Sequence, residues 1–214
     1  MKKPKFKLVD DLSIADWVKE TLYPWDRNNF LQLGTVIPEG FASYISIRNE
    51  TKVPGNDWPE TFNHEKLTLK LLDHTETPER CFYGMWNGFG IDYEANYSEL
   101  FEGKKKTFDK FSKRYWYENI YHLENRGYYL LEGTLLDSLK IVEDSYHDQI
   151  HEYINILWPL DRAWFLAKEI DFEVTLIGGS AELINELEES GHFQTERFTV
   201  QTRTNEIFLV DSSD

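Results

Sequence analysis

The sequence predicts an α+β fold, with a mixed, mostly antiparallel sheet and flanking helices in a single domain. Short apolar segments typical of strands occur in both halves of the chain. Segments with helical spacing lie between them, but strands and helices do not alternate as they do in a βαβ protein. With 214 residues, 41% of them hydrophobic and 15% aromatic, the chain is long enough to bury one substantial core.

The first half of the chain contains four expected elements. Ser13 is expected to cap a helix over 14–23, which Pro24 ends because proline cannot continue a helix. The other three are a strand at 41–48, a helix at 64–74 and an aromatic strand at 81–86.

The second half contains the best-specified helix, over 181–190. Ser180 is its expected N-cap, and Gly191 is its expected C-cap. The segment 162–170 has a continuous apolar centre, which predicts a strand buried on both faces. The other expected elements are strands at 128–135, 174–177, 197–203 and 206–210, and a helix at 147–157 before Pro159.

The domain organisation follows from the lack of any repeat or linker. Residues 1–214 are expected to form one domain in which 93–127 is a peripheral insertion. That stretch shows no clean periodicity and carries a dense basic cluster at 104–114.

The charge is strongly negative and uneven. The chain has 23 basic and 38 acidic residues, a formal net charge of −15 at pH 7. Residues 151–214 alone contain 13 acidic and 4 basic residues. Such a surface repels nucleic-acid phosphates, so no nucleic-acid partner is expected. It attracts a basic protein, although a high net charge also serves solubility alone.

The sequence also indicates where in the cell the protein is located. No apolar run approaches the ~18–20 residues of a spanning helix, and the N-terminal residues lack a signal-peptide core. Cys81 is the only cysteine, so neither an intramolecular disulfide nor a cysteine-rich metal site is expected. We expect a cytoplasmic protein with no membrane partner and no cofactor; the oligomeric state is left open.

Five blocks of sequence occur in an order that resembles a group of bacterial proteins common in soil actinobacteria. They are IPEGFASY at 37–44, HTETPERCFYGMWNGFG at 74–90, YYLLEGTL at 128–135, WPLDRAW at 158–164 and IDFEVTLIGGS at 170–180. The chain departs from the group at Thr134, where a proline is usual. The group carries no established activity, so the resemblance implies one integrated domain and adds nothing on chemistry.

The first candidate site is Asp161-Arg162, which lies between Trp158 and Trp164. Arg162 could bind a carboxylate or phosphate while the flanking tryptophans form the walls of a pocket. The structural alternative is that Arg162 pairs with a nearby carboxylate and stacks on a tryptophan.

The second candidate is the turn Gly178-Gly179-Ser180, which follows a strand and opens a helix. Backbone N–H groups at a helix N-terminus can bind an anion. The turn lacks the further glycines or lysine of a phosphate-binding loop, so a tight turn capped by Ser180 is the alternative.

Three weaker candidates have ordinary structural explanations. His147 and His151 share a helical face, but the HExxH pattern of a metalloprotease is absent and no metal is expected. Cys81 lies in an aromatic strand, which favours a buried thiol over a nucleophile. The last candidate is a set of acids at a strand end that could do acid–base chemistry: Glu169, Asp171 and Glu173.

Two functional hypotheses follow. The first is an acidic protein-binding module, in the manner of immunity proteins that cover a basic toxin. The second is an enzyme with a pocket near Arg162 and the Gly178-Gly179-Ser180 turn. A broad acidic face favours the first, and a deep pocket in which Arg162 meets carboxylates favours the second.

Overall fold

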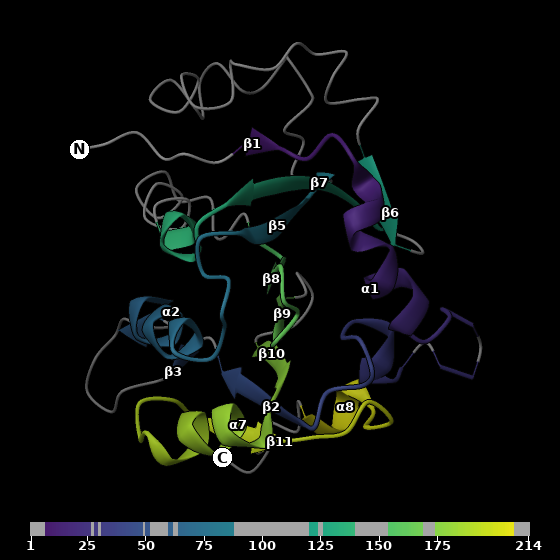
Figure 1. Ribbon diagram of the computed structural model, residues 1–214. Helices are drawn as coiled ribbons and strands as arrows, with labels where there is room; N and C mark the ends of the chain where they lie inside the picture. Colours follow the sequence, from purple (N-terminus) through teal and green to yellow (C-terminus); the bar gives the residue numbers. More distant parts are fainter. Residues whose placement is uncertain are drawn as a thin grey trace, which may run out of the picture.

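The computed structural model is built around one nine-stranded sheet in which every pair of neighbouring strands runs antiparallel (Figure 1). The structure describes residues 7–26, 28–29, 31–48, 50–51, 60–61, 64–87, 120–123, 126–139, 154–168 and 174–207.

The strands of the sheet come from the whole length of the described chain. Their order is β1-β7-β5-β8-β9-β10-β2-β11, and β6 also pairs with β7. Two short strands, β3 (Glu50–Thr51) and β4 (Glu60–Thr61), form a separate pair. The bounds in the main sheet are β1 (Lys7–Leu8), β2 (Ser43–Arg48), β5 (Cys81–Trp86), β6 (Ile120–Leu123), β7 (Arg126–Gly133), β8 (Ile156–Pro159), β9 (Phe165–Lys168), β10 (Val174–Gly179) and β11 (Thr195–Arg197).

Helices cover both faces of this sheet (Figure 1). α2 (His64–Leu72) and α7 (Ala181–Glu189) pack on one face through Leu71, Leu183 and Leu187. The opposite face is covered by the segments η1 (Leu12–Ala15), α1 (Asp16–Thr21), η2 (Leu33–Thr35) and α8 (Thr204–Ile207). Within the described ranges, no helix is long and apolar enough to cross a membrane.

Aromatic rings fill the layer between α1 and the sheet. Trp158 of β8 stacks on Phe82 at 5.5 Å and on Phe165 at 5.8 Å between ring centroids. Trp17 of α1 meets Trp158 edge-on at 6.2 Å. Trp158 and Phe165 are at most 1% exposed, so this stack ties the central strands to α1.

The expected fold class is confirmed, and several elements lie where the sequence places them. The strand at 81–86 has the predicted bounds. Ser180 caps α7 by accepting a hydrogen bond from the Leu183 backbone N–H at 3.1 Å. Gly191 follows that helix with φ of 64°, the left-handed conformation that glycine tolerates at a helix end.

Three predictions around the central strands and the first helix were wrong. β9 begins at Phe165 and not at 162, because Arg162 has φ of 57° and closes a turn back to the Pro159 carbonyl. Residues 156–157 of the expected helix belong to β8, while 147–153 lie outside the described residues. Ser13 is not a cap but lies within η1, which is capped by the Asp11 side chain accepting from the Ser13 N–H; α1 follows with no side-chain cap.

The expected strand at 197–203 was also wrong, and so was the start of the one at 206–210, whose residues 208–210 lie outside the described residues. β11 ends at Arg197, and residues 198–203 form turns held by a bond from the Leu33 N–H to the Thr202 carbonyl. Residues 204–207 form α8, whose start is secured by a bond from the Arg203 N–H to the Glu206 carboxylate. Of the stretch 93–127, residues 120–123 form β6 beside β7, and 93–119 lie outside the described residues.

The packing of α7 can be tested at Leu187, which is 0% exposed. Leu187→Ala is expected to lower the free energy of unfolding by about 2–5 kcal/mol, because it removes apolar contacts and leaves a cavity. Leu69 of α2 is 48% exposed and serves as the matched control. Leu69→Ala should change the stability by no more than about 0.5 kcal/mol in the same urea titration. Equal effects of the two changes would show that α7 does not pack on the sheet.

Candidate functional site

Asp161 joins two loops at one end of the sheet. Its carboxylate accepts hydrogen bonds from the Thr75 hydroxyl at 2.9 Å, the Glu76 N–H at 2.7 Å and the Ala163 N–H at 3.1 Å. The Asp161 N–H in turn donates to the Thr77 hydroxyl at 3.1 Å. Asp161 therefore holds the loop at 75–77 against its own loop, and this structural role explains why an aspartate is present here.

Arg162 and Trp164 diverge from this turn to opposite faces of the sheet. The Arg162 guanidinium lies 5.0 Å from the centroid of the Trp17 ring, on the α1 side. Trp164 is fully buried on the α2 side, where its indole N–H donates to the Leu71 carbonyl at 3.0 Å. The cation–π alternative therefore describes Arg162, with Trp17 as its partner. The structure does not bring Arg162 and Trp164 together around a common pocket.

The structure places Gly178 and Gly179, predicted to lie in a turn, at the end of β10, where both are tightly packed. A Cβ on Gly178 would lie 2.6 Å from the Phe41 ring, and one on Gly179 would lie 2.8 Å from a Leu183 methyl carbon. Glycine is needed here because neighbouring side chains occupy that space. The Ser180 hydroxyl is engaged as the cap of α7. These contacts explain each residue of the turn without a bound anion.

The remaining chemical candidates offer no reactive group in the described residues. Burial, helped by the charges of Asp161 and Glu79, raises the pKa of the Cys81 thiol to about 12, so the thiol stays protonated at neutral pH. In the described part of the chain, no group of three His, Cys, Asp or Glu residues could hold a metal ion. The acids at 169–173 and the histidines at 147 and 151 lie outside the described residues.

The exposed side of α7 is acidic, and its acids differ in their partners. Glu186 contacts Lys70 and accepts from His74 at 2.8 Å, and the Lys70 and His74 bonds lower the pKa of its carboxyl. Glu188 pairs with Arg197 at 2.8 Å, which lowers the pKa of Glu188. Within the described chain, the exposed residues Glu182 and Glu189 form no such ion pair and present their charge to solvent.

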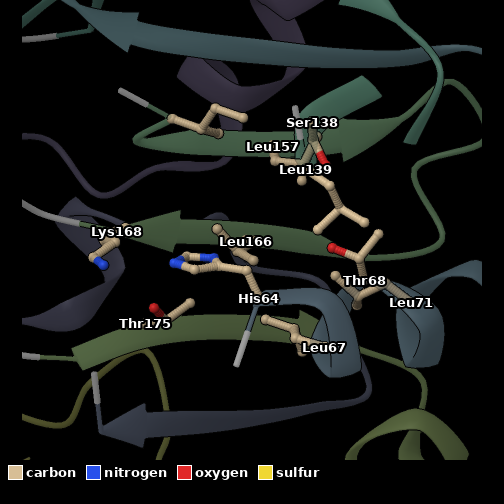
Figure 2. Close-up of a pocket in the computed structure, with 11 residues that line it drawn as sticks. His64, Leu67, Thr68, Leu71, Ser138, Leu139, Leu157, Leu166, Lys168 and Thr175 are labelled. Carbon is tan, nitrogen blue, oxygen red and sulfur yellow. The ribbon is translucent and has the colours of Figure 1, made fainter. Parts of the chain in front are cut away.

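The structure also contains a small cavity between α2 and the sheet, which the sequence did not predict (Figure 2). Its volume is about 30 Å³, which suits about two water molecules. The His64 ring extends from the start of α2 toward Lys168 and Thr175. The full lining is His64, Leu67, Thr68, Leu71, Ser138, Leu139, Ile154, Leu157, Leu166, Lys168 and Thr175.

Strand register brings the polar groups of this cavity together. Lys168 of β9 lies directly opposite Thr175 of β10, so both side chains share the face that α2 covers. Burial, and then the charge of Lys168, lower the pKa of His64 to about 3. His64 is therefore neutral at pH 7.

Sequence reasoning missed this cavity because His64 lies more than 100 positions before Lys168 and Thr175 in the chain. The available signals were Lys168 at the end of an apolar strand and Thr175 within another. Neither signal indicates a cavity unless the register of the two strands is known.

No family model, curated protein or solved structure matches this chain.

The structural role of Asp161 can be tested against an exposed acid in the neighbouring loop. Asp161→Ala is expected to lower the free energy of unfolding by about 1–2 kcal/mol, because backbone N–H groups lose a charged acceptor at an exposed site. Glu79→Ala is the matched control and should change it by less than about 0.5 kcal/mol. Chemical denaturation of both variants measures the difference. If Asp161→Ala were as stable as the wild type, Asp161 would not be needed to hold the two loops together.

Proposed function

We propose that this protein is an acidic binding module whose partner is a basic protein. The observation that supports this proposal is the charge of the chain. Its formal net charge is −15, and residues 151–214 contain 13 acidic and 4 basic residues. A charge of this size produces a long-range potential that attracts a cationic partner and speeds its encounter.

The exposed side of α7 is the part of this acidic surface that the structure describes best. α7 is fixed by its buried Leu183, Ile184 and Leu187, so its outer carboxylates have a defined spacing. Among the described residues, Glu186 and Glu188 form ion pairs with Lys70 and Arg197, whereas Glu182 and Glu189 form none and keep more of their field. A rigid helix with uncompensated carboxylates suits a partner that presents lysines or arginines.

The geometry lends less support to the enzyme hypothesis at Arg162. Arg162 stacks on Trp17, and the two glycines of the turn fit against side chains. The cavity near His64 has room for about two water molecules and is far smaller than the ~300 Å³ or more of usual ligand pockets.

The binding proposal predicts a salt-sensitive association that depends on α7. A partner recovered by affinity purification from the source cell should be basic. Glu182→Lys combined with Glu189→Lys should slow its association about tenfold at low salt, because the change reverses local charge on the docking face. Stopped-flow or surface-plasmon measurements at several salt concentrations give the rates.

The matched control has the same change in net charge on the opposite layer of the molecule. Glu20 of α1 and Glu39 are exposed, and changing both to Lys should slow association by about threefold or less. Equal slowing by both variants would mean that net charge acts without an α7 docking face. A neutral partner, or association rates that ignore salt, would overturn the proposal.

A further inference from the structure

One end of the main sheet has an open edge at β11. The strand order ends there, and among the described strands only β2 pairs with β11 (Figure 1). Thr195 is partly exposed, and Glu196 and Arg197 are exposed. The open edge of a strand presents backbone groups with which another extended chain can pair.

The register of β11 against β2 shows which backbone groups face outward. In an antiparallel pair, residues whose backbone groups bond to the neighbouring strand alternate with residues whose groups point away from it. The Gln194 carbonyl accepts from a β2 N–H at 3.0 Å, and the Phe198 N–H donates to a β2 carbonyl at 3.4 Å. Glu196, midway between them, therefore faces β2 as well. The N–H and C=O of Thr195 and Arg197 point to the open edge, where no described residue bonds to them.

The side chains around this edge include two acids that lack an ion pair. Arg197 donates to Glu188 of α7 at 2.8 Å. This pairing with Glu188, and then the charge of Glu189, raise the pKa of the Arg197 guanidinium, so Glu189 lies close to the same edge. Within the described ranges, the exposed residues Glu189 and Glu196 form no ion pair. They lie on opposite faces of the strand, because Arg197 reaches α7 and neighbouring side chains alternate.

Charge decides between a foreign strand and a second copy of this chain. Two copies paired edge to edge as antiparallel strands centred on Glu196 would place the two Glu196 carboxylates directly opposite each other. Like charges in such positions destabilise a strand pair. Each copy also has a net charge of −15, which opposes their association. A basic strand meets neither obstacle.

We propose that an extended segment rich in lysine or arginine, belonging to the basic partner, pairs with β11 as an added strand. This inference rests on the proposed function and specifies how the partner is held. The segment exchanges backbone hydrogen bonds with Thr195 and Arg197. Its cationic side chains meet Glu189 on one face and Glu196 on the other. The backbone bonds can form with any extended segment, and the two carboxylates select a basic one.

Amide hydrogen exchange, followed by NMR in the full chain, tests whether the edge is open. The amides of Thr195 and Arg197 should exchange at least about tenfold faster than those of Glu196 and Phe198, which face β2. Slow exchange at Thr195 and Arg197 in the free protein would mean that this chain or a second copy already covers the edge. That result would overturn the proposal.

The probe for binding is the peptide acetyl-Lys-Val-Lys-Lys-Val-amide, which presents lysines on both faces of an extended strand. It should shift the amide resonances of Thr195 and Arg197 saturably, with a dissociation constant on the order of 1 mM for so short a strand. At saturation it should slow the exchange of both amides about fivefold or more. No saturable shift at these two amides would overturn the added strand.

Two further peptides separate strand pairing from charge. The same peptide N-methylated at every residue keeps its charge but has no backbone donors, and it should bind about fivefold more weakly or worse. A peptide with glutamates in place of the lysines should not bind, because it meets like charges. Equal binding by the methylated peptide would mean that charge alone holds the segment, and would overturn the added strand.

Two variants and one control locate the effect on the protein. Thr195→Pro removes an outward N–H and should weaken binding of the lysine peptide about fivefold or more, since an edge strand tolerates proline at such a position. Glu196→Lys should weaken it by a similar factor and tests the edge even where Thr195→Pro fails to fold. Glu79 precedes β5, which four strands separate from β11, and Glu79→Lys should change binding by less than about twofold. Equal weakening by Glu79→Lys and Glu196→Lys would overturn the site.

The position of the shifts separates this inference from the proposed function. Shifts confined to the start of α7, such as at Glu182, with none at Thr195 and Arg197, would overturn the added strand and leave the acidic docking face on α7 standing. Absence of shifts at both places, together with a natural partner that is neutral, would overturn both proposals.

Discussion

The fold depends on three central strands that are apolar on both faces. β8, β9 and β10 are buried almost throughout, so neither face of the sheet can be left in contact with water. Two layers of cover are therefore required. α2 and α7 supply one layer, and α1, η2 and α8 supply the other. Apart from the separate β3–β4 pair, the other strands of the described chain extend this sheet.

This constraint also decides what the most conspicuous sequence motif can do. Successive side chains of a strand point to opposite faces, so aromatic residues close in sequence enter different layers. Trp158 and Phe165 belong to the α1 layer, whereas Trp164 belongs to the α2 layer. The dense block WPLDRAWFLA is explained by the need to fill both layers from one short stretch. Arg162 projects from its turn onto Trp17 and completes the edge of one layer.

Local signals in the sequence were sufficient where one residue decides the structure. Ser180 sets the start of α7 and Gly191 sets its end, because an N-cap and a left-handed glycine each act within a single helical turn. The C-terminal residues were mispredicted because tertiary bonds to Leu33 and Gly34 set the turns at 198–203. The cavity at His64 also escaped prediction, since it requires the register of β9 against β10. The acidic side of α7 could be foreseen only as an excess of acids, because the pairing of Glu186 and Glu188 depends on partners from α2 and β11.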